Sequence, residues 1–259
     1  MRKTILVTGA TSGFGKAIAE LFAKNGYDVC ITGRRAERLS AIKAELENYG
    51  IKVYTLRFDV RSKQDVADAI AKLKNEVDSI DILVNNAGLA AGMSSIDEGD
   101  TDDWDLMVDT NVKGLLYVTR QVMPLIKKSS AGHIINIGST AGKNVYKNGN
   151  VYCATKFAVD ALTQSMRIDL LPYGIKVTAI NPGAAETEFS LVRYKGDAER
   201  AKNMYTGFIP LRAEDIANVV YYSATLPPHV CINDLTLTRT TQANSVYNIK
   251  EADKISLQK

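Results

Sequence analysis

Short runs of apolar, mostly β-branched residues alternate along the chain with longer segments in which apolar residues recur every three or four positions. Runs of the first kind predict strands buried on both faces, and segments of the second kind predict the helices that cover them. This alternation is typical of repeated β-α-β units. The predicted strands span residues 4–8, 29–32, 53–58, 80–84, 133–137, 177–180 and 235–237, and the predicted helices span 16–24, 36–49, 63–76, 104–127 and 152–171.

The predicted fold class is α/β, a Rossmann-type doubly wound parallel sheet with helices on both faces. We expect a single domain over residues 1–259, because no shift in composition marks a boundary. Ligands of such sheets bind beyond the carboxyl ends of the strands, so functional residues should follow the strands directly. Two segments interrupt the alternation: the polar residues 184–210, predicted as a substrate lid, and residues 239–259, predicted as a C-terminal interface arm.

Charge and hydropathy argue against several classes of protein. The formal net charge is only +3, and basic and acidic residues are interleaved, so no nucleic-acid partner is predicted. No uncharged apolar run approaches the roughly 18 residues that span a bilayer. The first predicted strand begins at residue 4, which leaves no room for a signal peptide. We therefore expect a cytoplasmic protein with no membrane partner.

The cysteines and histidines do not indicate a metal site. Cys30, Cys153 and Cys231 are odd in number and far apart, which is typical of reduced thiols. His133 lies in a predicted strand and His229 in a Pro-rich turn, too far apart along the chain to suggest a shared ion. We expect no metal.

A glycine-rich segment, Gly9 to Gly15 (GATSGFG), joins the first predicted strand to a helical pattern. Gly9, Gly13 and Gly15 permit a tight turn, close approach to a pyrophosphate and close packing of helix against strand. The start of the helix adds free N–H groups and a partial positive charge. The segment predicts a dinucleotide site. A turn that merely connects two elements is the weaker interpretation, given the strand before it and the helix after it.

The end of the second predicted strand indicates which nicotinamide cofactor is used. An acidic residue there would bind the ribose hydroxyls of NAD, but this chain has Gly33 followed by Arg34 and Arg35. A guanidinium binds a 2′-phosphate through charge-assisted hydrogen bonds, so NADP is favoured. The alternative is that both arginines are a solvated start to the next helix. Asp59, after the third strand, is a candidate acceptor for the adenine amino group.

Tyr152 and Lys156 are four residues apart in a predicted helix and so share one face. A phenol with a pKa near 10 exchanges a proton at neutral pH only when its anion is stabilised, and a nearby ammonium does this. Ser139, just beyond a strand, can polarise a substrate oxygen beside Tyr152. Asn111, in the preceding helix, is a candidate to hold a water that relays protons from Lys156.

A Tyr–Lys pair alone is weak evidence, but its place in an ordered series of motifs is specific. Over essentially its whole length the chain resembles the short-chain dehydrogenase/reductase family. The motifs that carry the resemblance are Thr8 to Gly15, Asn85 to Gly88, Asn111, Ser139, Tyr152-x-x-x-Lys156 and Asn181-Pro182-Gly183.

The resemblance implies a catalytic tetrad of Asn111, Ser139, Tyr152 and Lys156. It also implies that the glycine loop carries the pyrophosphate, that Lys156 binds the nicotinamide ribose, and that the segment after Asn181 contacts the nicotinamide. Ser12 stands where some NADP-preferring members have a further basic residue, which predicts a less than strict preference for NADP. The cofactor-binding residues so predicted are Gly9, Thr11, Ser12, Gly13, Phe14, Gly15, Arg34, Arg35, Asp59, Val60, Asn86, Ala87, Gly88, Tyr152, Lys156, Pro182, Gly183 and Thr187.

Within the family, longer stretches are similar to NADP-dependent 3-hydroxy acid dehydrogenases that act on serine and allo-threonine. These stretches are residues 85–91, 132–142, 149–156 and 187–196. Gly183 to Glu186 departs from the glycine- and valine-rich version found in those enzymes. Ser139 and Tyr152 are predicted to contact the substrate. Arg193 either pairs with a substrate carboxylate or is a solvated lid residue.

The predicted function is therefore hydride transfer between NADP(H) and the carbinol or carbonyl carbon of a small 3-hydroxy acid. Two alternatives stay open: reduction of another carbonyl, such as a 3-oxoacyl thioester, a sugar or a steroid, and a nucleotide-binding scaffold without turnover. The family resemblance also implies a homotetramer built on the helices predicted over residues 104–127 and 152–171.

Overall fold

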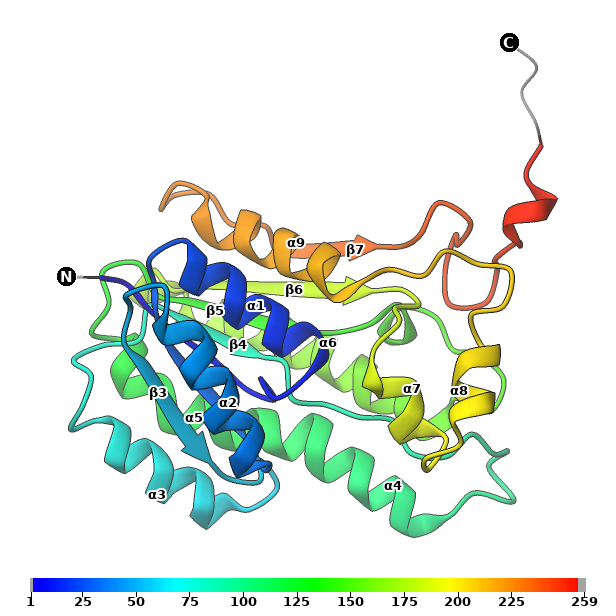
Figure 1. The fold of residues 1–259 in the computed structure, drawn as a ribbon, viewed down its shortest axis with the longest axis horizontal. Coiled ribbons are helices and arrows are strands. Elements are labelled where there is room, and N and C mark those ends of the chain that lie inside the picture. The colour runs from blue at the N-terminus through cyan, green and yellow to red at the C-terminus, as the bar shows by residue number, and fades with distance from the viewer. Residues whose placement is uncertain (1, 256–259) are drawn as a thin grey trace.

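A computed structural model describes residues 2–255 of the chain. Within this range seven strands form one parallel sheet, in the order 3-2-1-4-5-6-7 along the chain numbering (Figure 1). The ends of the predicted strands differ from the observed ones by at most two residues. The strands are β1 (Thr4–Val7), β2 (Asp28–Gly33), β3 (Val53–Arg57), β4 (Ile82–Asn85), β5 (His133–Ile137), β6 (Lys176–Pro182) and β7 (Asp234–Leu237).

Helices cover both faces of the sheet because neighbouring residues of each strand point to opposite sides. In β1, Ile5 packs in the cluster that contains α1 (Gly13–Lys24), α2 (Ala36–Glu47) and α9 (Ala213–Thr225). Leu6 packs in the cluster that contains α3 (Lys63–Leu73), α5 (Leu115–Ile126) and α6 (Asn150–Leu170). Figure 1 shows α1 and α9 together on the near face. The predicted Rossmann-type doubly wound α/β sheet is confirmed.

The single helix predicted over residues 104–127 is wrong. The segment consists of α4 (Thr101–Val108), a π-helical turn over Asp109–Gly114, and α5. Asn111 lies in this turn and hydrogen-bonds to the backbone of Leu89 and to the side chain of Thr155. Apolar residues keep recurring at three and four positions across such a turn, so periodicity does not reveal it. Single π turns in α-helices are frequent at functional sites.

The two segments that interrupt the alternation lie beyond the carboxyl ends of the strands. Residues 184–210 contain two short helices, α7 (Glu188–Arg193) and α8 (Ala198–Asn203), which Figure 1 shows past the arrowheads of the sheet. Residues 239–255 follow β7, and the Gln242 side chain accepts a hydrogen bond of 2.9 Å from the backbone of Ala184. Residues 256–259 of the predicted arm, and Met1 of the predicted domain, lie outside the described residues.

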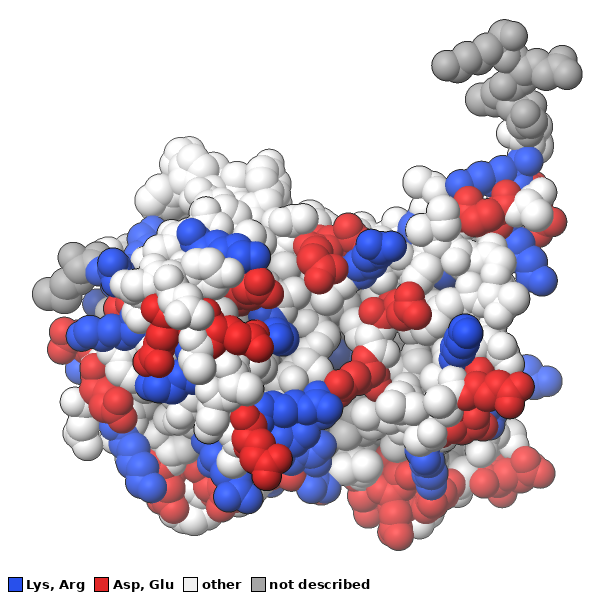
Figure 2. Space-filling view, in the orientation of Figure 1, with Lys and Arg blue, Asp and Glu red and all other residues white. Residues whose placement is uncertain are grey.

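The surface carries both signs of charge. On the face drawn in Figure 2, basic and acidic side chains are largely interspersed, which agrees with the interleaving in the sequence. Over residues 2–255, no helix combines the length and the apolar character that a bilayer span requires.

His133 makes the stability of the fold depend on pH. It is 1% exposed in β5, and its Nε2 lies 2.7 Å from Thr178 Oγ1. Burial, with a smaller contribution from the charge of Lys176, lowers the pKa of His133 from 6.5 to about 3. The native protein therefore binds fewer protons at this site than the unfolded chain does. Above pH 6.5 His133 is neutral in both states, and the free energy of unfolding keeps its full value. As the pH falls from 6.5 toward 3, the unfolded chain binds a proton that the native protein does not, and the free energy of unfolding decreases.

We expect the free energy of unfolding to fall by about 2 kcal/mol between about pH 7 and pH 4.5 because of His133 alone. In His133→Gln, which does not titrate, this part of the slope should be absent. Urea unfolding followed by circular dichroism at a fixed protein concentration measures it, with His229→Gln, at an exposed histidine, as the control. An unchanged slope in His133→Gln would contradict the assignment.

Candidate active site

One cavity of about 620 Å³ opens at the carboxyl ends of the strands. It brings together residues from the segments that follow all seven strands, including the segment 184–210. Of the residues predicted for the site, Gly15 and Asn111 do not line the cavity. Those that line it are Gly9, Thr11, Ser12, Gly13, Phe14, Arg34, Arg35, Asp59, Val60, Asn86, Ala87, Gly88, Ser139, Tyr152, Lys156, Pro182, Gly183, Thr187 and Arg193.

The glycine loop is shaped for a group that approaches its backbone closely. Gly9 and Gly13 have positive φ angles of 66° and 52°, which glycine adopts without strain. A Cβ at Gly15 would stand 2.5 Å from the Gly9 carbonyl oxygen, so only glycine lets α1 pack this near to β1. Ser12 precedes α1 without capping its N–H groups. Free donors at a helix start beside a glycine turn fit the pyrophosphate of a dinucleotide.

The two arginines after β2 differ in the number of contacts that their guanidinium groups make. Arg35 donates to Thr11 Oγ1 at 2.8 Å and to Ser12 Oγ at 3.0 Å, which docks it on the glycine loop. Arg34 has a side chain 62% exposed and only a long ion pair, 3.7 Å, to Asp59. Burial would raise the pKa of Asp59, but hydrogen bonds from Arg61 outweigh it and the pKa falls below its usual value. Arg34 is therefore the freer guanidinium for a 2′-phosphate.

Glu188 ties the start of α7 to the cofactor end of the cavity. Its carboxylate pairs with Arg35 at 3.0 Å and with Arg38 at 2.7 Å. Burial works against ionisation, but these two guanidinium groups hold the pKa of Glu188 below its usual value. The preceding residue, Thr187, caps α7 and packs against Gly13. Sequence reasoning missed the role of Glu188, because its partners lie about 150 positions earlier in the chain.

Tyr152 and Lys156 lie on the first turns of α6, as their spacing predicts. Lys156 is 7% exposed, and its Nζ donates to the carbonyl oxygen of Ile137 at 2.9 Å. Its Nζ stands 5.9 Å from the centre of the Tyr152 ring. Burial lowers the pKa of Lys156 to about 8. The ammonium is held at a fixed place beside the phenol, and its proton is easier to remove than that of a solvated lysine.

The pKa of Tyr152 reflects opposing influences. Burial raises it above 10, whereas the Arg193 guanidinium and the Ser139 hydroxyl lower it. Ser139 Oγ accepts a hydrogen bond of 3.0 Å from the backbone N–H of Ala141, so its O–H can donate to Tyr152 or to a ligand oxygen in the cavity. Ser139 and Tyr152 both line the cavity, so two hydroxyl groups can meet one substrate oxygen there.

Asn111 supports the site from behind. Its Oδ1 accepts from the Leu89 N–H at 2.8 Å, and its Nδ2 donates to the Leu89 carbonyl at 2.8 Å and to Thr155 Oγ1 at 3.0 Å. These bonds join the loop after β4 to α6. A Cβ at Gly88 would stand 3.2 Å from Asn111 Oδ1 and 3.7 Å from Lys156 Nζ, so glycine keeps the space between them open. The role of Asn111 in a proton relay stays a prediction.

Arg193, at the end of α7, turns into the cavity. Its Nη2 donates to Tyr146 Oη at 2.8 Å, and its Cζ lies 4.8 Å from the centre of the Tyr152 ring. The Nε–H is buried and has no hydrogen-bond partner among residues 2–255. Of the two interpretations of Arg193 from the sequence, this placement favours contact with a ligand over a solvated position.

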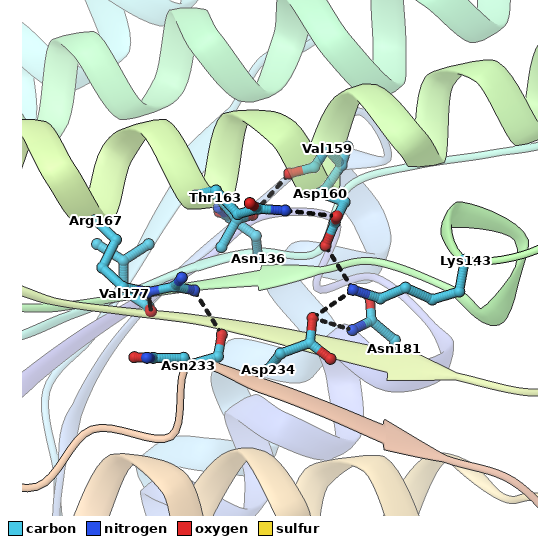
Figure 3. A network of polar contacts seen from close by, with 11 residues as sticks. Asn136, Lys143, Val159, Asp160, Thr163, Arg167, Val177, Asn181, Asn233 and Asp234 are labelled. Atoms are coloured by element: carbon cyan, nitrogen blue, oxygen red, sulfur yellow. Dashed lines mark hydrogen bonds and ion pairs between the residues drawn. The ribbon is translucent and has the colours of Figure 1, made fainter.

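A polar network, also missed from the sequence, anchors α6 to the edge of the sheet (Figure 3). Lys143 Nζ bridges Asp160 of α6 at 2.7 Å and Asp234 of β7 at 2.6 Å. Asn181 of β6 donates to the same Asp234 at 3.0 Å, and Arg167 of α6 donates to the backbone of Asn233. The helix that carries Tyr152 and Lys156 is thus held by charged hydrogen bonds as well as by its apolar face.

Comparisons with known proteins agree with this arrangement. A family model described as short chain dehydrogenase matches residues 3–196. An NADP-dependent 3-hydroxy acid dehydrogenase of Salmonella typhi is 48% identical over 240 residues, 92% of this chain and 96% of the relative. Sulfoacetaldehyde reductase 2 of Chromohalobacter salexigens is 43% identical and covers 96% of this chain and 99% of its own length. The closed form of a serine dehydrogenase complexed with NADP+ has a TM-score of 0.89 at 44% identity, with 96% of this chain and 99% of that chain covered.

Replacing Arg34 tests the preference for NADP that the sequence predicts. In Arg34→Ala we expect the KM for NADPH to rise about 10- to 100-fold, the value of one or two charge-assisted hydrogen bonds, with little change in the KM for NADH. Arg61→Ala is the matched control, because Arg61 also pairs with Asp59 but does not line the cavity. Steady-state kinetics with both cofactors measure the effect. Equal changes for NADPH and NADH would show that Arg34 does not bind the phosphate.

Proposed function

This chain belongs to the short-chain dehydrogenase family, and from that premise we propose that it oxidises small 3-hydroxy acids, or reduces the corresponding 3-oxo acids, with NADP(H). The observation that carries the proposal is Arg193, whose guanidinium lies against Tyr152 in the same cavity. A cation at this place suits a substrate with an anionic group close to the reacting carbinol. The relatives named for 3-hydroxy acid, serine and sulfoacetaldehyde substrates support this choice.

The residues of the cavity fit the cofactor. The uncapped start of α1 and the glycine turn suit the pyrophosphate, Arg34 the 2′-phosphate, and the segment from Pro182 to Thr187 the nicotinamide. NADP, when bound there, supplies the hydride acceptor or donor. The remaining tasks, which are orientation of the substrate and transfer of its hydroxyl proton, belong to the side chains of this chain.

Tyr152 takes the hydroxyl proton during oxidation and returns it during reduction. The Arg193 guanidinium lowers the pKa of Tyr152 by its charge. The Lys156 ammonium, 5.9 Å from the centre of the Tyr152 ring, is placed to stabilise the phenolate as well, and Ser139 donates a hydrogen bond to the substrate oxygen. Because oxidation starts from deprotonated Tyr152, kcat/KM for oxidation should rise with pH. Asn111, through Leu89 and Thr155, keeps α6 at a fixed distance from the loop after β4.

Tyr152→Phe should lower turnover by about 100- to 10,000-fold, the usual contribution of a general acid–base, while NADPH binding stays nearly intact. Fluorescence titration measures the binding. A kinetic screen with serine, allo-threonine and other 3-hydroxy acids, beside 3-oxoacyl thioesters, sugars and steroids, measures the rates. Tyr194→Phe, at a lid tyrosine that does not line the cavity, is the control. Wild-type rates in Tyr152→Phe would disprove the role of Tyr152, and a preference for thioesters, sugars or steroids would replace the substrate class.

Arg193→Met keeps most of the side-chain volume but removes the charge. We expect kcat/KM for a 3-hydroxy acid to fall about 10- to 100-fold, because one charge-assisted contact is lost. For the methyl ester of the same acid, kcat/KM should fall much less. That smaller fall measures the part of the effect that comes from a changed pKa of Tyr152. A hydroxysulfonate of equal length should follow the acid, since a guanidinium binds either anion. Parallel losses for acid and ester would place the effect on Tyr152 and not on the carboxylate.

The proposal includes a homotetramer in the cytoplasm. What supports the assembly is a set of apolar side chains exposed on the two helices expected at its interface. Leu116 of α5 is 38% exposed, and Phe157 and Ile168 of α6 are 42% and 75% exposed. Exposed apolar side chains on adjacent helices are typical of surfaces that associate.

A further inference from the structure

A second arginine, Arg239, lies buried in the wall of the same cavity. It follows β7 directly, is 8% exposed and lines the cavity. Its Nη2 donates to Asn248 Oδ1 at 3.2 Å, but its Nε–H is buried without a hydrogen-bond partner among residues 2–255. Within that range no carboxylate stands within 4 Å of its guanidinium. Neither the glycine loop nor the catalytic side chains account for this cation.

A buried guanidinium with so few partners is expensive unless something else neutralises it. Burial lowers the pKa of Arg239, and the charges of Glu251 and Tyr205 offset only part of this effect. The guanidinium lies over the Phe208 ring at 4.0 Å, which holds its plane in place but uses none of its N–H groups. The side chain is therefore positioned in advance, with donors left for a ligand.

Three polar residues in the stretch of chain after Arg239 line the same cavity. Ser245 lines the same cavity, and its hydroxyl is buried without a partner among the described residues. Asn248 lines the cavity too and holds Arg239. Gln242 fixes the stretch over the sheet, since it accepts from the Ala184 N–H and donates to the Asn244 carbonyl. Arg239, Ser245 and Asn248 thus form a group of donors on a fixed backbone, which we call the arm subsite.

The arm subsite and Arg193 line one cavity and are both tied to the segment 184–210. Arg239 lies over the ring of Phe208, and Tyr205, three residues earlier, is hydrogen-bonded through its hydroxyl to Ser190 of α7, the helix that ends in Arg193. The acidic residues that line the cavity are Asp59 and Glu188, and both are paired with arginines at the cofactor end. The substrate end therefore presents two guanidinium groups and no carboxylate among the described lining residues.

We propose that the arm subsite binds a second anionic group of the substrate, so that the preferred substrates are 3-hydroxy acids with a further carboxylate at the far end of the chain. This inference rests on the proposed function. The first carboxylate pairs with Arg193 beside Tyr152, and the second pairs with Arg239 and accepts hydrogen bonds from Ser245 and Asn248. A guanidinium with free N–H groups in a partly closed site favours a planar carboxylate over a neutral methyl end.

The test compares acids that differ only at the far end. 3-Hydroxyadipate and 3-hydroxyhexanoate have six carbons each and end in a carboxylate and a methyl group, and 3-hydroxyglutarate and 3-hydroxypimelate vary the length. For the length that fits, we expect kcat/KM of the diacid to exceed that of the monoacid by about 10- to 100-fold. Arg239→Met should abolish this ratio and Arg239→Lys should restore part of it. A merely structural role of Arg239 would lower both rates together and leave the ratio unchanged.

Arg200→Met is the matched control, because Arg200 stacks on Tyr194 of the lid but does not line the cavity. Its ratio of diacid to monoacid should equal that of the wild type. Calorimetric titration of adipate and hexanoate into the NADP-loaded protein supplies a readout that needs no turnover. Absence of turnover with every 3-hydroxy acid would refute the proposed function alone. Equal binding of adipate and hexanoate, or an equal loss of both in Arg239→Met, would refute the arm subsite alone.

Discussion

A parallel sheet ends all its strands on one edge, and every part of the site depends on this constraint. Because the strand order reverses between β1 and β4, the loops after these strands separate and leave a crevice in which backbone groups stay accessible. The glycine loop enters from one side of this crevice and the β5 loop with Ser139 from the other. Residues more than a hundred positions apart come together there, although no sequence motif links them.

The position of α6 converts this edge into a reactive site. Lys156 is buried against the Ile137 carbonyl. Burial of a lysine costs free energy, so the packing and the polar contacts around α6 must hold it there. Lys143 supplies such contacts by joining α6 to β7, while Asn111 joins α6 to the loop after β4. Helix α6 is therefore fixed on two sides, which keeps Tyr152 and Lys156 in place relative to β7 and to the loop after β4.

Guanidinium groups divide the cavity into regions of different use. Arg34 stands open at the cofactor end, whereas Arg35 is bound to the glycine loop and to Glu188. Arg193, at the other end of α7, lies against the ring of Tyr152. The short helix α7 thus connects the cofactor end with the substrate end through Glu188 and Arg193. The lid expected over residues 184–210 stays a prediction.

The sequence alone determined the fold class, the seven strands and the part of the cavity lining formed by the glycine loop with Ser139, Tyr152 and Lys156, because buried strands and glycine turns leave local patterns that need no partner to be recognised. The Tyr152–Lys156 spacing is likewise a property of one helix. Only the tertiary structure decided that Asn111 sits in a π-helical turn and that Glu188 pairs with Arg35. It also decided that Arg193 and Arg239 are turned into the cavity while Arg34 stays half open to solvent. The sequence does not show whether an arginine is solvated or buried, because residues distant in the chain form its environment.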